Sequence, residues 1–287
     1  MTDAAIHDLG YQRYAGRRGG AVEARRALFV QGLRAMFGLG RSAKAKIVPV
    51  FVLVVTMLPA LANLAAASAA QGQLPVRYGV VIGAQLMLFV LFAAAQTPEL
   101  LSRDQQHQLL PLLLTREVSR AGYAVTRLLA VFCSMLLVAL APLLLLYVGE
   151  IGIAADPAAA FRTMGDRIGP VLLFGTTTAW VFATLGAALA SLTARRAYAT
   201  AGVIGLLLVA GAVAGGLEDL AGVSPKITAL LDPIRALRTL ALVLFGETTR
   251  AMELKPPPSV AAHLLSLGTF GAVACAVYWQ RIRRLRV

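Results

Sequence analysis

Residues 128–148 read LLAVFCSMLLVALAPLLLLYV, and this stretch decides the fold class of the chain. It contains no Asp, Glu, Lys or Arg, and as a helix it is long enough to cross a hydrocarbon core of ~30 Å. A membrane β-strand would instead alternate apolar and polar residues over only ~10 positions. The stretch therefore predicts a membrane-spanning α-helix.

Five more stretches of this kind occur along the chain. They cover residues 47–67, 78–96, 168–192, 198–216 and 260–279, and none contains a charged residue. The whole chain is 58% hydrophobic and only 14% charged, whereas about a quarter of the residues in a soluble domain are charged. We expect an all-α, polytopic membrane protein with six transmembrane helices in a single domain over residues 47–280.

The distribution of charge predicts the orientation of the chain. The net charge is +13, and lysine and arginine between spans mark the cytoplasmic side. Basic residues concentrate in residues 1–46, in 97–127, directly after 192 and in the tail 281–287. Both termini are therefore expected in the cytoplasm of a bacterial cell, with the spans in its plasma membrane. A nucleic-acid partner is not expected, because no segment forms a folded basic domain.

One segment before the first span has the pattern of an amphipathic helix. Within residues 25–40, Phe29, Leu33, Met36 and Phe37 share one helical face. Apolar residues on one face, flanked by arginines, are typical of a helix that lies in the membrane interface. We therefore expect an interfacial helix within the cytoplasmic segment 1–46.

Residues 227–245 are apolar but carry Asp232, Arg235 and Arg238. Pro233 is suited to the start of a helix and not to its interior. The part from Pro233 to Phe245 is too short to cross a bilayer. We expect short surface or re-entrant helices here, within an extracytoplasmic loop over residues 217–259.

The connection over residues 97–127 reads TPELLSRDQQHQLLPLLLTREVSRAGYAVTR. It is charged at first, then has a leucine patch over residues 109–114, and ends in a basic stretch. An apolar patch on a cytoplasmic loop needs cover, either from interfacial lipid or from a protein partner. Long loops are also uncommon where they have no role. This loop is therefore the first candidate for a functional site.

The stretch from Glu99 to Tyr123 resembles the first cytoplasmic loop of ABC transporter permeases of the type-2 export family. The resemblance rests on the Arg103-Asp104 pair, on the run Leu112-Leu113-Leu114-Thr115-Arg116, and on Ser119-Arg120 followed by Tyr123. The chain departs from the family where Gln108-Leu109 replaces a Gly-Thr pair and where Glu117 replaces a proline. The Leu231-Asp232-Pro233 step is similar to an Asn-Pro step in related permeases.

The resemblance implies a function in transport. Such a chain is the non-catalytic permease subunit of an ATP-binding cassette exporter and is not an enzyme. Its partners are two ATPase subunits that hold Mg-ATP and a second permease subunit, identical or homologous. The chain itself has no Gly-x-x-x-x-Gly-Lys-Ser/Thr sequence to hold a nucleotide. The residues implied in coupling to the ATPase are Glu99, Arg103, Asp104, Leu110, Leu113, Arg116, Arg120 and Tyr123.

A second group of candidates lies within the spans. Thr176, Thr177 and Thr178 could line a pathway, although hydroxyls in helices usually bond to the preceding turn. Gly211 and Gly215 have the spacing that lets helices pack closely, within the chain or between subunits. The three histidines are scattered and predict no metal site.

Three other functions remain open from the sequence. A secondary transporter would usually carry charges inside its spans, and these spans have none. A membrane-embedded enzyme would need clustered His, Asp or Glu at the membrane face. An assembly protein without a transport role stays possible, and nothing in the sequence identifies a substrate.

Overall fold

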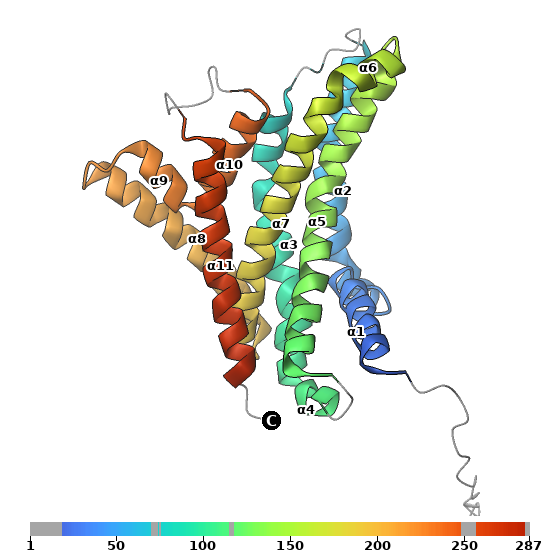
Figure 1. The fold of residues 1–287 in the computed structure, drawn as a ribbon, viewed down its shortest axis with the longest axis vertical. Helices are drawn as coiled ribbons and strands as arrows, with labels where there is room; N and C mark the ends of the chain where they lie inside the picture. Colours follow the sequence, from blue (N-terminus) through green and yellow to red (C-terminus); the bar gives the residue numbers. More distant parts are fainter. Residues whose placement is uncertain (1–18, 70–73, 75, 115–117, 248–256, 285–287) are drawn as a thin grey trace, which may run out of the picture.

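The computed structural model describes residues 19–69, 74, 76–114, 118–247 and 257–284. All regular elements in these ranges are helices, and no strand occurs among them (Figure 1). Within these ranges, six helices are long and apolar enough to cross a membrane, and the fourth is extended by the short elements before it. They are α2 (Ala43–Ala69), α3 (Tyr78–Gln106), α5 (Arg120–Ile153), α7 (Ile168–Leu192), α8 (Arg196–Asp219) and α11 (Val260–Arg284). The all-helical class is thus confirmed, and the six long apolar helices fit the expected multi-pass membrane protein.

Shorter helices occupy the connections. They are α1 (Ala21–Met36), α4 (Leu109–Leu114), α6 (Pro157–Met164), the 3-10 turn η1 (Gly165–Arg167), α9 (Pro225–Leu231) and α10 (Pro233–Leu244). Proline begins α6, α9 and α10, where its missing N–H would have no intrahelical partner. Asp156 and Asp232 accept hydrogen bonds from the first amides of α6 and α10. The expected helices within 25–40 and 227–245 are therefore present.

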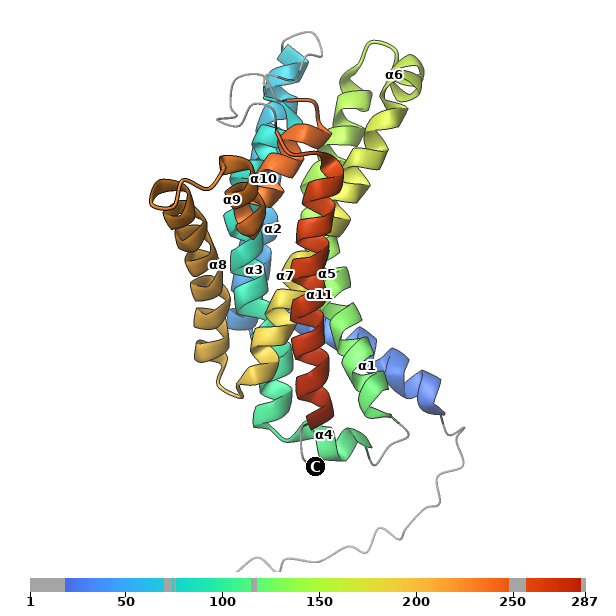
Figure 2. The same ribbon diagram turned by 60° about the vertical axis from the view of Figure 1, so that its left-hand side comes forward.

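The connection over residues 97–127 is more helical than its composition indicated. The α3 helix continues to Gln106, and α5 already begins at Arg120, so little of the connection is a true loop. Between them α4 lies across the ends of α3 and α5 (Figure 2). Glu99, Arg103 and Asp104 consequently lie on the last turns of a long helix.

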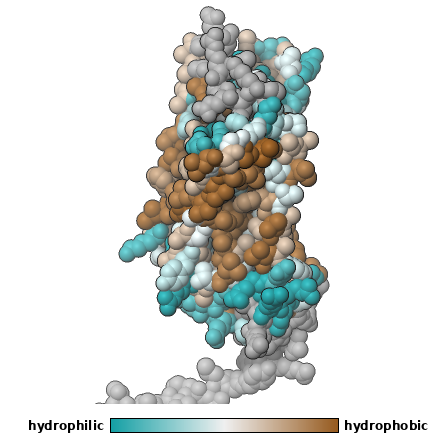
Figure 3. Space-filling view, turned by 90° about the vertical axis from the view of Figure 1, so that its left-hand side faces the viewer, coloured by the Kyte–Doolittle hydropathy of each residue, from teal (hydrophilic) through white to brown (hydrophobic). Residues whose placement is uncertain are grey.

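The core is centred on α3 and α7. In their most apolar windows, 67% of the α3 residues and 78% of those in the fourth span are buried, but only 17% of those in α8. Figures 1 and 2 show α8 at the edge of the bundle. On the face shown in Figure 3, apolar residues form a band between two hydrophilic ends. This surface matches the requirement of a bilayer, because lipid covers an apolar band.

A proline interrupts the hydrogen bonding of α3. Pro98 has no N–H and cannot donate to the carbonyl of Ala94 four residues earlier. The hydroxyl of Thr200 in α8 donates to this carbonyl instead, at 2.7 Å. Serine and threonine side chains commonly satisfy the backbone groups that prolines free within membranes. The bond therefore joins the first turns of α8 to the interrupted part of α3.

This arrangement predicts energetic coupling between the two positions. Replacing Thr200 by Val should lower the free energy of unfolding by about 1–3 kcal/mol, because it leaves the Ala94 carbonyl unpaired. In a Pro98→Ala background the same substitution should cost much less, because the residue 98 amide then occupies that carbonyl. Unfolding of the four proteins in mixed micelles measures this double-mutant cycle. Equal costs of Thr200→Val in both backgrounds would contradict the assignment.

Candidate functional site

A buried ion pair joins α3 to α5. Arg127 contacts Asp104 Oδ2 through Nε and through Nη2, each at 2.8 Å. The two side chains are only 2% and 8% exposed. Either charge alone would cost several kcal/mol to bury. The pair therefore fixes how the end of α3 sits against the start of α5.

Three more hydrogen bonds surround this ion pair, and two of them reach a third helix, α1. The Nη1 atom of Arg127 donates to the Leu28 carbonyl at 3.3 Å and to Gln31 Oε1 at 2.6 Å, both in α1. The Tyr123 hydroxyl donates to Asp104 at 2.9 Å. Helices α1, α3 and α5 thus meet in one polar network within the bundle.

A second charged cluster surrounds Glu99 on α3. Arg41, in the turn before α2, contacts Glu99 Oε2 at 2.5 Å. Arg196, at the start of α8, forms an ion pair with Glu99 Oε1. Arg103 lies one helical turn further along α3, with Nη1 at 3.9 Å from the same carboxylate. One carboxylate therefore receives arginines from three parts of the chain.

The leucine patch forms the short helix α4. It follows Gln108, which adopts a positive φ of 48°, and this left-handed residue turns the chain sharply after α3. Leu113 packs against a hydrophobic cluster that includes Leu101, Val118 and Tyr278. Pro111 is exposed. The described side chains of the patch, those of Leu109, Pro111 and Leu113, are thus only partly covered by the chain itself.

The other predicted coupling residues fall into two groups. Arg120 is exposed, and its Nη1 donates to the Arg283 carbonyl at the end of α11. The Leu110 side chain and all of Arg116 lie outside the described part of the structure. The structure therefore gathers Glu99, Arg103, Asp104, Leu113, Arg120 and Tyr123 at the end of the bundle where α4 lies, called the α4 end below.

The candidate lining residues do not form one group. Thr176 is exposed, and Thr177 donates to the Leu173 carbonyl. Thr178 is buried, and its hydroxyl has no hydrogen-bond partner in the described part of the chain. A Cβ at Gly215 would meet open space, and one at Gly211 would lie 3.5 Å from Asp232. Gly215 therefore makes no close helix contact among the described residues.

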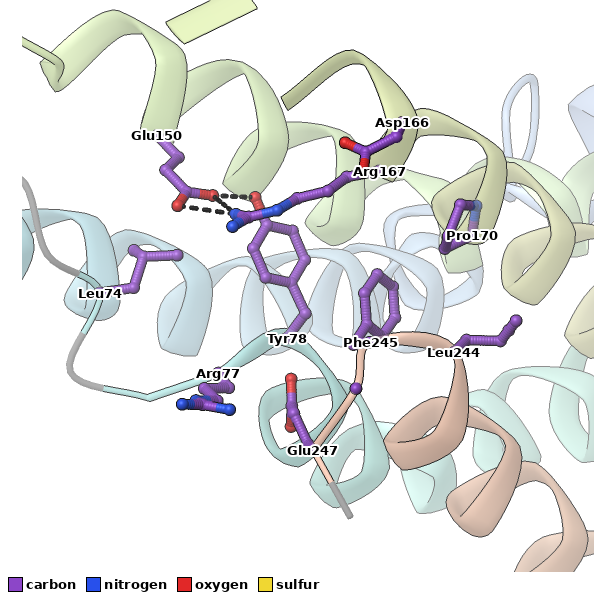
Figure 4. A pocket seen from close by; sticks show the side chains of 11 residues that line it. Leu74, Arg77, Tyr78, Glu150, Asp166, Arg167, Pro170, Leu244, Phe245 and Glu247 are labelled. Carbon is purple, nitrogen blue, oxygen red and sulfur yellow. Dashed lines mark hydrogen bonds and ion pairs between the residues drawn. The ribbon is translucent and has the colours of Figure 1, made fainter. Parts of the chain in front are cut away.

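The opposite end of the bundle contains a cavity of about 670 Å³ (Figure 4). The Tyr78 hydroxyl donates to Glu150 at 2.6 Å, and Arg167 donates to both oxygens of Glu150 at 2.9 and 3.0 Å. The Tyr78 ring stacks on Phe245, with centroids 5.2 Å apart. Residues from α3, α5, η1 and the end of α10 thus meet around polar walls.

Glu247 fixes the other side of this cavity. Its carboxylate accepts hydrogen bonds from the amides of Gly79 and Val80 at 2.8 and 3.1 Å, at the first turn of α3. A negative charge is favourable there because of the helix dipole. Burial nevertheless raises the pKa of the Glu247 carboxyl. Sequence patterns gave no sign of this site, because its partners lie far apart in the chain.

The Asp104–Arg127 pair gives a prediction for stability. Arg127→Met alone should lower the free energy of unfolding by about 3–5 kcal/mol, because it leaves Asp104 buried without a counter-charge. Adding Asp104→Leu should recover most of this loss, since both charges are then removed. Unfolding of the single and double variants in mixed micelles measures the effect. Additive losses would show that the two charges do not depend on one another.

Comparison with known proteins assigns no family to this arrangement. No family model matches the chain, and no curated protein matches its sequence. Among the described residues, no group of three or more His, Cys, Asp or Glu side chains could hold a metal ion.

Proposed function

We propose that this chain is the transmembrane permease subunit of an ATP-binding cassette exporter. The observation that carries the proposal is α4, a short leucine-rich helix at the turn between α3 and α5. It has an exposed Pro111 on one side and Leu113 packed on the bundle on the other. A helix of this kind can bind a partner and transmit its movement to the helices on both sides.

The polar network supports such transmission. The Asp104–Arg127 pair and the bonds from Arg127 to α1 hold α1, α3 and α5 together at the α4 end. Packed elements of this kind move as rigid bodies between discrete arrangements. Two ATPase subunits with bound Mg-ATP would drive this movement, and a second permease subunit would complete the pathway.

The proposal includes an orientation. The α4 end carries Arg41, Arg103, Arg196 and the last turn of α11, which contains Arg281, Arg283 and Arg284. By the positive-inside rule this end faces the cytoplasm. Both termini then lie on the cytoplasmic side. The α1 helix would lie in the interface, where its buried Leu28 and Met36 face the bundle.

Helices α9 and α10 fit a re-entrant hairpin on the outer side. The turn between them places Asp232 beside Gly211 of α8, which lies ~12 Å along the helix from its end at Asp219. Asp232 accepts a hydrogen bond from the Ile234 amide at 2.9 Å, and Arg235 contacts Glu218, near the end of α8, at 2.7 Å. After α10 the chain returns to the start of α3 through Glu247. The hairpin of α9 and α10 thus begins and finishes at the same end of the bundle.

Capture of a partner tests the proposal. The tagged full-length chain is extracted from its native membrane under gentle conditions, and co-purifying proteins are identified and assayed for ATP hydrolysis. Pro111→Asp places a charge on the exposed side of α4. It should lower recovery of an ATPase at least ~10-fold, as for a central interface residue. Phe161→Asp is the matched control, because Phe161 is 61% exposed on α6 at the opposite end.

The result separates the proposed function from its rivals. Recovery of an ATPase with the parent chain and with Phe161→Asp, but not with Pro111→Asp, supports docking on α4. Equal recovery of the ATPase with both variants would show that the ATPase does not dock on α4. Recovery of the chain without any ATPase would favour a secondary transporter or an assembly protein.

A further inference from the structure

The Glu99 cluster borders two adjacent hollows at the α4 end. Their volumes are about 320 and 280 Å³, and Arg41, Glu99, Arg103 and His107 line both. Arg196 lines the second. We call this surface, defined by these five residues, the arginine hollow. It lies where α2 and α8 begin, on either side of the Glu99 face of α3.

The arginine hollow has a surplus of positive charge. Three arginines face one carboxylate, because Asp104, which also lines the larger hollow, is committed to Arg127. Each guanidinium has five N–H donors, and Glu99 can accept only some of them. The Arg103 and Arg196 side chains are 49% and 56% exposed. Donors therefore remain for an anion, and arginine binds phosphate oxygens in a bidentate manner.

An apolar stripe on α3 leads into the arginine hollow. Val80, Met87 and Leu91 are 46%, 56% and 38% exposed, and exposed Ala84 and half-buried Ala95 continue the same helical face to Glu99. From Ala84 to Ala95 the stripe is ~16 Å long. This is about half of a ~30 Å hydrocarbon core, the depth of one leaflet.

We propose that the arginine hollow binds the phosphate of an anionic phospholipid from the surrounding leaflet, with an acyl chain along the α3 stripe. Basic pockets between membrane helices on the cytoplasmic side bind anionic head groups. A second copy of the chain fits this surface less well. A two-fold contact through it would place its surplus of arginines against an identical surplus. The proposal is independent of an ATPase partner.

Native mass spectrometry of the full-length chain in detergent tests this site. Dioleoyl phosphatidylglycerol and dioleoyl phosphatidylcholine are added separately, and retained lipid is counted. The chain should retain one phosphatidylglycerol in preference to phosphatidylcholine. Arg103→Ala/Arg196→Ala should weaken its binding about 30-fold, roughly fivefold for each arginine removed. Arg283→Ala/Arg284→Ala removes the same charge from exposed positions at the same end and should leave binding unchanged.

A second measurement leaves every arginine in place. In a Leu91→Trp variant, brominated phosphatidylglycerol should quench the new tryptophan more strongly than brominated phosphatidylcholine. The parent chain, with Trp180 and Trp279 alone, should show no such preference. Equal quenching by the two lipids at Leu91→Trp, or equal retention of the two lipids in the first measurement, overturns the proposal.

Two further outcomes would also overturn the proposal. Release of the retained lipid by excess inorganic phosphate would assign the hollow to a soluble anion. A Leu91→Cys variant tests for a second copy of the chain. If two copies form a disulfide at this position and the linked dimer no longer retains phosphatidylglycerol, the stripe is assigned to a second copy of the chain.

Discussion

The buried contact between Asp104 and Arg127 is the constraint on which the α4 end depends. Neither charge can be buried without the other, so the end of α3 and the start of α5 must lie in one fixed register. The same arginine holds α1 through Gln31 and a backbone carbonyl. The turn that carries α4 joins these two fixed helices. Its position therefore follows from an ion pair inside the bundle, and not from the packing of its own few residues.

The sequence predicted the spans well, because a long apolar run without charges has few alternatives to a membrane helix. Pro233 also marked a local helix start that the structure contains. The sequence could not predict which of the six spans lie in the centre of the bundle. Both α7 and α8 are apolar on all sides, yet most of the fourth span around α7 is buried, and only 17% of the apolar window of α8 is. In a membrane, lipid and protein surroundings select similar side chains, so periodicity does not distinguish the two.

The ion pairs between distant residues could not be predicted from the sequence either. Glu99 stood out as part of a motif, but its partners Arg41 and Arg196 lie 58 and 97 residues away. The sequence placed Asp104 in the connection between two spans, whereas it is buried at the end of α3. No sequence pattern predicted the cavity at the end opposite α4, because Tyr78 and Glu150 come from different helices. Side chains at helix ends are brought together by the tertiary packing, which no local pattern records.

The polar contacts between α8 and α3 are concentrated in one part of α3. Within the described residues, α8 is the least buried span, and its polar contacts to α3 are those of Arg196 with Glu99 and of Thr200 with the Ala94 carbonyl. Both lie beside Pro98, where the backbone hydrogen bonds of α3 are interrupted. A movement of the last turns of α3 would bend the helix at this point. Because the contacts to α8 lie on both sides of the interruption, α8 would have to tilt or lose one of them.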